Sequence, residues 1–447
     1  MPDADEARRS RLDAALASAR ETRAVEIGRG ALSRVVELFR AHFGDREPVI
    51  VADSATFNAA GRAVQEFFAA AGVKMQPPFI FTDPDLYAQY DFIDDLDEWM
   101  GSHGAVPFAV GSGTINDLVK LAAHHAGRPY MAVATAASMD GYTAFGASIT
   151  KKGLKQTFEC PAPVAVLADL DVIAKAPPEL NAAGYADLLA KNTAGADWIV
   201  ADGLGVEPID QTAWQLVQGR LKESVADPAG VRRGDANAIA DLVEGLMMSG
   251  LAMQWTKSSR PASGAEHQFS HLWDMQRVGH SADTPSHGFQ VGIGTLAVAR
   301  LYEALFEAHL DRIDVETLAG HWPDEPVVVR QVTDVFEQPR LARLAAKETT
   351  AKKPPWSARR HHLTRIHDTW PKLKKRLAEH LIPAAEIEKM LEEAGAPTSG
   401  AQIGVSPPRL AASYRQAYHI RRRYTVLDLA ERAGVLDTCV ARMGSEP

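Results

Sequence analysis

Short apolar runs alternate with helical stretches through the first third of the chain, and this alternation constrains the fold most. Four compact apolar runs predict buried strands: 48–52, 79–81, 105–110 and 130–134. Residues 58–71 carry apolar side chains at helical spacing and precede Gly72, a residue type that commonly ends helices. Strands and helices that alternate in this way form a parallel sheet covered by helices on both faces.

Helical patterning replaces this alternation after about Pro161. Residues 164–170 form the last predicted strand, and residues 237–253 and 290–308 predict long apolar helices. The segment 349–365 is basic and contains prolines, which predicts a surface loop or an insertion. The second part of the chain is therefore expected to be mostly helical.

The length of the chain predicts two domains, because 447 residues exceed what one hydrophobic core usually serves. We expect an α/β domain with a parallel sheet over residues 1–160 and an all-α domain over residues 161–447. Ligands commonly bind in the groove between two such domains.

The composition excludes several classes of protein. A net charge of −9 argues against non-specific binding to nucleic acid, whose phosphates require basic faces. Two cysteines, Cys160 and Cys439, are too few for a disulfide framework or a cysteine-rich metal site. Met1–Arg20 lacks the apolar core of a secretory signal, and no apolar run is long enough to predict a membrane span. We therefore expect a cytoplasmic protein without nucleic-acid or membrane partners.

A glycine-containing turn follows the strand predicted at 105–110. In the sequence GSGTINDLVK, Gly111 and Gly113 let the backbone approach a phosphate without a clashing Cβ. The helix that follows offers unpaired N–H groups and a favourable dipole to a pyrophosphate. Because position 116 is Asn, the turn is neither a G-x-G-x-x-G motif nor a P-loop. An ordinary strand–turn–helix that needs small residues is the alternative interpretation.

A second segment strengthens the phosphate-binding interpretation. TAASMDGYT, from Thr135 to Thr143, follows the next predicted strand and therefore lies at the same edge of the sheet. Small and hydroxylated residues at that edge suit ligand contacts in open α/β sheets. A plain glycine-containing loop is the alternative.

Isolated acids and histidines occur in three segments of the helical half. Asp187 is predicted in the first turn of an apolar helix, His267 and His271 share one helical face, and His287 precedes another apolar helix. Two imidazoles and a carboxylate suit a divalent ion that acts as a Lewis acid. The i, i+4 spacing allows both His267 and His271 as ligands, although HQFSH lacks the glutamate of HExxH sites. A single histidine among fifteen is more often a surface or core residue, so spacing alone leaves this open.

Together these segments resemble a known family. GSGTINDLVK, TAASMDGYT, AGYADLLAKNTAGADW, SRPASGAEHQFSHLWDM and HGFQVGIGT occur in the order and spacing of the sn-glycerol-1-phosphate dehydrogenases, with the MDGY form of the bacterial branch. That family belongs to the superfamily of iron-containing alcohol dehydrogenases, glycerol dehydrogenases and dehydroquinate synthases. The resemblance extends from Ala24 to Thr295, and Arg421–Leu429 resembles the family's C-terminal end.

The resemblance implies a dehydroquinate synthase-like fold, in which a Rossmann-like, dinucleotide-binding α/β domain precedes a helical domain that binds metal and substrate. It also implies NAD or NADP as cofactor and one divalent metal ion, zinc or nickel, with iron as a third candidate. Resembling proteins often form homodimers or larger assemblies, so we expect a homo-oligomer.

Site residues are carried over by their place in the motifs. The resemblance implies that Asp187, His267 and His287 bind the metal ion. It implies that Asp140, Asp187 and His271 border the substrate, with Asp140 and His271 as catalytic candidates for proton transfer. The cofactor-binding residues would be Asp53, Gly111, Gly113, Thr114, Ile115, Asn116, Asp117, Thr135, Ala136, Ala137 and Ser138.

The reaction implied is hydride transfer between a nicotinamide ring and C2 of a small phosphorylated polyol, interconverting dihydroxyacetone phosphate and sn-glycerol 1-phosphate. The substrate phosphate requires cationic partners, and Arg260, Lys257 and Lys191 flank the proposed metal segments.

Two departures from the family pattern concern the cofactor and the surroundings of the metal. Ala144 stands where the family has a serine that contacts the cofactor, and Phe289 stands where it usually has a glutamate. Three alternatives therefore remain. They are a dehydrogenase of glycerol or another alcohol, a dehydroquinate-synthase-like lyase, and a binding protein that kept the fold without the activity.

Overall fold

The computed structural model describes residues 4–276 and 285–443 of the chain. Its N-terminal part is built on a six-stranded sheet in the order β1-β8-β5-β4-β2-β3, and every adjacent pair of strands is parallel. The strands are β1 (Ala24–Gly28), β2 (Pro48–Asp53), β3 (Phe79–Phe81), β4 (Val106–Gly111), β5 (Met131–Ala134) and β8 (Ala165–Asp169). The predicted α/β domain with a parallel sheet is confirmed.

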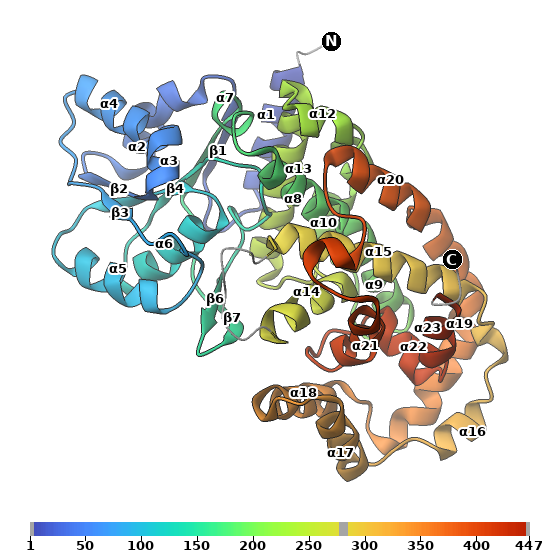
Figure 1. Ribbon diagram of the computed structural model, residues 1–447. Coiled ribbons are helices and arrows are strands. Elements are labelled where there is room, and N and C mark those ends of the chain that lie inside the picture. Colours follow the sequence, from blue (N-terminus) through green and yellow to red (C-terminus); the bar gives the residue numbers. More distant parts are fainter. Residues whose placement is uncertain (1–3, 277–284, 444–447) are drawn as a thin grey trace.

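Helices cover both faces of this sheet (Figure 1). The first helices pack against one face through an aromatic cluster in which Phe39, Phe68 and Phe108 lie 5.2–5.5 Å apart between ring centroids. A second core on the other face is continuous with that of the helical half. The covering helices are α2 (Val35–Phe43) and α4 (Arg62–Ala70) on the first face, and α5 (Asp91–Gly101) and α6 (Gly113–His125) on the second.

Strand β8 is the second strand of the sheet, between the edge strand β1 and β5. The sheet thus includes residues on both sides of the boundary predicted at residue 160. An antiparallel hairpin, β6 (Ala147–Lys151) and β7 (Leu154–Phe158), interrupts the chain before β8 and was not predicted from the sequence. Figure 1 shows this hairpin on the side of the sheet that faces the helical half.

The rest of the chain is helical, as predicted. The site is built by α8 (Pro178–Leu189), α9 (Lys191–Gly203), α13 (Ala236–Thr256), α14 (Ala265–Gln276) and α15 (His287–Phe306). The other helices are α1 (Ala4–Leu16), α3 (Ser54–Thr56), α7 (Leu170–Ile173), α10 (Gln211–Gln218), α11 (Leu221–Ser224), α12 (Pro228–Arg233), α16 (Val315–Gly320), α17 (Glu325–Val335), α18 (Pro339–Lys352), α19 (Arg359–His380), α20 (Ala384–Ala394), α21 (Pro407–Tyr418), α22 (Val426–Arg432) and α23 (Leu436–Met443). Single turns of 3-10 or π-helix are η1 (Ala31–Arg34), η2 (Phe57–Gly61), η3 (Leu310–Arg312), η4 (Trp356–Ala358) and η5 (Gly400–Ile403).

The prediction of a surface loop at 349–365 is wrong. Helices α18 and α19 cover most of that segment, and only residues 353–358 connect them. Thr349, His362 and Leu363 are buried, so the basic side chains mark the outward faces of two amphipathic helices. The prolines at 354 and 355 lie between the helices, where a missing N–H is tolerated.

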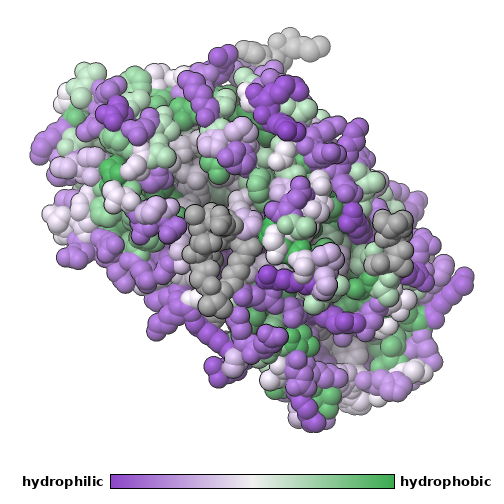
Figure 2. Space-filling view, viewed as in Figure 1, coloured by the Kyte–Doolittle hydropathy of each residue, from purple (hydrophilic) through white to green (hydrophobic). Residues whose placement is uncertain are grey.

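Among the described residues, no helix combines the length and the apolar character needed to cross a membrane. Polar and charged side chains dominate the face seen in Figure 2, and apolar residues form only small scattered patches on it.

Candidate active site between the sheet and the helices

Two glycines let three elements of the site approach one another closely. A Cβ at Gly184 of α8 would lie 1.7 Å from the carbonyl oxygen of Ala137, in the loop after β5. A Cβ at Gly288 of α15 would lie 2.0 Å from the carbonyl oxygen of Ala183. Because both obstacles are backbone atoms, α8 fits between this loop and the start of α15 only with glycine at these positions.

The predicted metal ligands converge at this junction. One ligand atom from each of Asp187, His267 and His287 lies within 4.8 Å of the other two. Asp187 and His267 are buried, and His287 is partly exposed. The predicted position of Asp187 in the first turn of its helix is wrong. Helix α8 begins earlier, at Pro178, which suits the first position of a helix, and Asp187 lies in its last turn.

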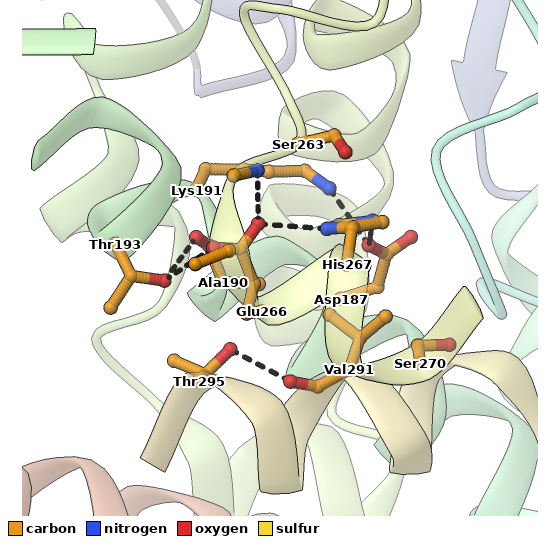
Figure 3. Close-up of polar contacts among 12 residues, drawn as sticks. Asp187, Ala190, Lys191, Thr193, Ser263, Glu266, His267, Ser270, Val291 and Thr295 are labelled. Carbon is orange, nitrogen blue, oxygen red and sulfur yellow. Dashed lines mark hydrogen bonds and ion pairs between the residues drawn. The ribbon is translucent and has the colours of Figure 1, made fainter. Parts of the chain in front are cut away.

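Each of the two candidate ligand histidines, His267 and His287, is oriented by a hydrogen bond at its Nδ1, so that its Nε2 could bind an ion. The Nδ1 of His267 lies 2.8 Å from a carboxylate oxygen of Glu266, and its Nε2 lies 3.5 Å from Asp187 Oδ1 (Figure 3). The Nδ1 of His287 lies 3.1 Å from the hydroxyl of Ser270. A carboxylate or hydroxyl behind the imidazole is the usual way in which a metal-binding histidine is oriented. The donor set therefore fits a divalent ion.

The charge states of Asp187 and His287 suit metal binding, which requires an ionised carboxylate and neutral imidazoles. Burial lowers the pKa of His267, but hydrogen bonds with Asp187 and Glu266 outweigh it and raise that pKa above its usual value, so a bound ion would have to displace a proton there. Burial raises the pKa of Asp187, but Lys191, His267 and His287 outweigh burial and hold that pKa well below its usual range. Burial, together with the nearby Lys155 and His267, lowers the pKa of His287 to about 3. Asp187 is thus ionised and His287 neutral at physiological pH.

A fully buried lysine connects Asp187 to Asp140. The Nζ of Lys191 lies 2.7 Å from Asp187 Oδ1 and 2.8 Å from Asp140 Oδ2. The backbone N–H of Asp140 donates to Asp187 Oδ2, and the hydroxyl of Ser249 donates to Asp140 Oδ2. Burial lowers the pKa of Lys191, but the two acids outweigh it and raise that pKa above its usual value, so the amine stays charged. Both predicted substrate acids thus lie together.

His271 lies one turn after His267, with its ring centroid 6.3 Å from that of His267 and 5.9 Å from that of His287. The guanidinium of Arg421 donates to its Nε2 at 2.9 Å. Burial, followed by the charge of Arg421, holds the pKa of His271 well below its usual value. The ring is neutral, and its buried Nδ1 has no hydrogen-bond partner among the described residues.

The glycine turn lies beside the loop that precedes Asp140, because Gly111 of β4 is paired with Ala134 of β5. Gly113 begins α6, and Thr114 lines a cavity of about 410 Å³ that His287 also lines. Lys155 of β7 and Asp274 of α14, 2.9 Å apart, form part of the same wall. The cavity therefore joins the predicted cofactor-binding turn to the predicted metal site.

Several of the other predicted cofactor residues form hydrogen bonds within the protein. The amide of Asn116 donates to the carbonyl of Gly141 and accepts from Tyr130, while Asp117 accepts from the backbone N–H of Ser148. Asp53 caps the short helix after β2 by accepting from the backbone N–H of Thr56. Ser138 is partly exposed, and the remaining predicted cofactor residues of these segments are buried: Ile115, Thr135, Ala136 and Ala137.

Sequence reasoning missed several residues that shape the site. Glu266 orients His267, and Arg421 comes from more than a hundred residues further along the chain. Lys120 is buried and donates to the carbonyls of Gly141, Ala144 and Gly146, so it holds the loop after Asp140. Only the conspicuous EH pair in SGAEH could have indicated Glu266, since long-range contacts leave no local signal.

The cations suggested for a substrate phosphate have other partners. Arg260 is buried and donates to the carbonyls of Tyr424 and Asp197, which fixes the chain rather than a ligand. Lys257 lies over the ring of Phe145. Lys191 is shared by two acids, as described above. None of the three is therefore a ready partner for a phosphate.

The two departures from the family pattern are packing positions. Ala144 is buried in a small apolar cluster with Met253 and Ala262, and its carbonyl accepts from Lys120. Phe289 is partly buried and packs against the two largest cores at once. Neither departure opens a gap in the site.

The chain is similar in sequence to several known proteins. Residues 26–177 match a family model described as iron-containing alcohol dehydrogenase. The chain is 29% identical over 405 residues to a glycerol-1-phosphate dehydrogenase, NAD(P)+, of Halalkalibacterium halodurans, and the match covers 90% of each protein. It is 41% identical over 195 residues to a protein of the same name from Pyrococcus horikoshii, covering 43% of this chain and 55% of that relative.

Two solved structures are similar in fold. The glycerol dehydrogenase of Schizosaccharomyces pombe matches with a TM-score of 0.59 and 16% identity, covering 95% of this chain and 92% of that one. A probable glycerol dehydrogenase from Sinorhizobium meliloti matches with a TM-score of 0.60 and 15% identity, covering 94% and 98%. At this identity the likeness concerns the fold, and it confirms the predicted dehydroquinate synthase-like architecture.

Proposed function

We propose that this chain, a member of the iron-containing alcohol dehydrogenase superfamily, interconverts dihydroxyacetone phosphate and sn-glycerol 1-phosphate with a divalent metal ion and NAD or NADP. The observation that carries the proposal is the convergence of Asp187, His267 and His287 beside a cavity that reaches the turn at Thr114. Relatives that match 90% of this chain carry the name glycerol-1-phosphate dehydrogenase.

Asp187, His267 and His287 would hold the metal, and zinc or nickel suits two imidazoles and a carboxylate best, with iron as a third candidate. When bound, a divalent ion supplies Lewis acidity toward the substrate oxygen, and the nicotinamide exchanges the hydride. The turn Gly111–Thr114 would bind the pyrophosphate, because α6 begins at Gly113 without a side-chain cap and the first turn of a helix offers N–H groups and a favourable dipole to an anion.

His271 and Asp140 have different parts in this proposal. Arg421 donates to Nε2 of His271, so the proton of the neutral ring is on Nδ1, which can donate to a substrate oxygen. A neutral imidazole is a weak acid, and we therefore assign to His271 the orientation of the substrate. Asp140 is 14% exposed at its side chain and accepts from Ser249 and Lys191, so it is our candidate for proton exchange with solvent.

The metal assignment is tested by His267→Ala. We expect this variant to lose both the bound ion, measured by elemental analysis, and turnover of dihydroxyacetone phosphate with either nicotinamide. His361→Ala removes an exposed histidine of α19 and serves as the matched control, with metal content and rate unchanged. A His267→Ala protein that keeps its full metal content would refute the assignment.

The substrate is tested on the unmodified protein. Initial rates with glycerol 1-phosphate, glycerol and simple alcohols, each with NAD and NADP, distinguish the proposed enzyme from a dehydrogenase of unphosphorylated alcohols. A protein that oxidises glycerol and ignores glycerol 1-phosphate would contradict the proposal. Net accumulation of reduced nicotinamide excludes a dehydroquinate-synthase-like lyase, which regenerates its cofactor within each cycle.

A further inference from the structure

The segment Arg421–Arg423, between α21 and α22, places three consecutive arginines in three different environments. Arg422 is exposed and forms a two-pronged ion pair with Glu348, at 3.0 and 3.2 Å. Arg423 donates to the carbonyl of Ser263 and the hydroxyl of Ser259, and so fixes the loop before α14. Arg421 turns toward the candidate active site, where its guanidinium donates to His271.

Arg421 has no carboxylate partner among the described residues. Its one hydrogen bond to the described residues uses one of five guanidinium N–H groups and goes to a neutral imidazole. The nearest acid that acts on it, Glu348, is already paired with Arg422. Burial lowers the pKa of Arg421 to about 10, and Glu348 offsets only part of this effect, so the group stays charged at neutral pH.

Arg421 is only partly exposed, and a partly desolvated cation without a counter-charge is costly, so such a group is expected to meet an anion supplied from outside the chain. The other cations around the site do not need one. Lys191 is paired with Asp140 and Asp187, and Lys155 is paired with Asp274. Among these, Arg421 carries the charge that remains uncompensated.

The location of Arg421 matches the size of the proposed substrate. Its Nη2 is 2.9 Å from Nε2 of His271. The ring centroid of His271 lies 6.3 Å from that of His267 and 5.9 Å from that of His287, a separation that a three-carbon phosphate can span. The buried Nδ1–H of His271 also lacks an acceptor among the described residues. Arg421 and the Nδ1–H of His271 thus both have donor capacity left, at the two nitrogen sides of one imidazole that lies beside the candidate metal ligands.

We propose that Arg421 binds the phosphate group of the substrate and thereby makes the site selective for phosphorylated over unphosphorylated three-carbon polyols and ketones. This inference rests on the proposed function and names its phosphate-binding residue. A guanidinium suits the task because its planar N–H groups can donate two parallel hydrogen bonds to a phosphate, and such charge-assisted bonds are the strong ones.

The test compares dissociation constants for dihydroxyacetone phosphate and for dihydroxyacetone, measured by calorimetry on zinc-loaded protein without nicotinamide, so that no turnover occurs. For Arg421→Gln we expect the phosphorylated ligand to bind about ten- to a hundredfold more weakly, the range for a lost charged hydrogen bond. Dihydroxyacetone should bind as it does to the unmodified protein. Arg421→Lys, which keeps the charge, should recover part of the loss.

Arg422→Gln is the matched control, because it removes the neighbouring cation on the outer surface and should leave both constants unchanged. Zinc content and the urea midpoint of each variant establish that it is folded, and Arg421→Lys carries the test if Arg421→Gln is not. The inference is overturned if the dissociation constant for dihydroxyacetone phosphate is unchanged, or if both ligands bind more weakly by the same factor. Arg421 would then act only by orienting His271. If the unmodified protein does not prefer the phosphorylated ligand, the proposed function itself fails, whatever Arg421 does.

Discussion

Lys191 offers a sharp test of how the buried charges of the site are balanced. Its ammonium lies between the carboxylates of Asp140 and Asp187, and the side chains of Lys191 and Asp187 are fully buried. Replacing Lys191 by Met keeps the length and apolar stem of the side chain but removes the cation. Removing one partner of a buried ion pair typically costs about 3–5 kcal/mol, because the remaining charge stays buried without compensation.

The size of this cost should depend on the metal. In metal-free protein, Lys191→Met leaves two acids facing each other, and we expect the full loss of about 3–5 kcal/mol in the free energy of unfolding. A divalent ion bound to Asp187 supplies positive charge at the same place, so the loss in zinc-loaded protein should be smaller by about 2 kcal/mol. By linkage, the variant must then bind zinc more tightly than the unmodified protein, by about thirtyfold.

The assay is urea unfolding with and without saturating zinc, together with a competition measurement of zinc affinity. Lys120→Met is the matched control, since Lys120 is equally buried but is held mainly by the carbonyls of Gly141, Ala144 and Gly146. Its cost should be the same in both forms of the protein. The reasoning fails if Lys191→Met costs the same with and without zinc and leaves the zinc affinity unchanged.

Two further predictions concern packing and acid stability. Gly184→Ala should lower the free energy of unfolding by about 1–3 kcal/mol and reduce metal content, because the new Cβ meets the carbonyl of Ala137. Gly101→Ala is the control, measured in the same urea titration. It should be neutral or slightly stabilising, because open space surrounds Gly101. Burial lowers the pKa of His380 to about 4, so the folded state resists the protonation that the unfolded chain accepts below about pH 6.5. The free energy of unfolding should therefore fall as the pH drops from 6.5 to 4, and His380 should contribute about 1–2 kcal/mol of this loss at pH 5. In a plot of urea midpoint against pH, His380→Gln should flatten this part of the curve. An unaltered curve would contradict the lowered pKa of His380.

The sheet could be predicted because its strands carry their own signal. Runs such as 48–52 and 130–134 are apolar, compact and buried on both faces, which is the pattern of a central parallel strand. The β6–β7 hairpin has polar residues and a turn at Lys152, which adopts a positive φ, so no apolar run marks it. The loop predicted at 349–365 was wrong because it was inferred from the charged composition of the segment. The spacing of its few apolar residues decides the fold instead.

The metal-binding set could be proposed because its residues lie in recognisable motifs, whereas the residues that control them could not. Glu266 adjoins His267 in sequence, yet nothing local shows that its carboxylate turns to the imidazole. The contact between Arg421 and His271 joins residues 150 positions apart. Such contacts follow from how α14 packs against the segment before α22, which is a property of the whole fold.

These controlling contacts also bear on which histidines we propose as ligands of one cation. The i, i+4 spacing of His267 and His271 allows both as ligands, but the side chains hydrogen-bonded to the two rings are opposite in charge. His267 is backed by the carboxylate of Glu266, which increases the basicity of the ring and leaves Nε2 directed at Asp187. His271 has its Nε2 occupied by the guanidinium of Arg421, and a second cation brought to that ring would be repelled. His287, backed by the neutral hydroxyl of Ser270, keeps a free nitrogen and has no such cation bonded to it. The arrangement therefore favours His267 and His287 as the metal ligands, and it supports our proposal that His271 donates a hydrogen bond to the substrate.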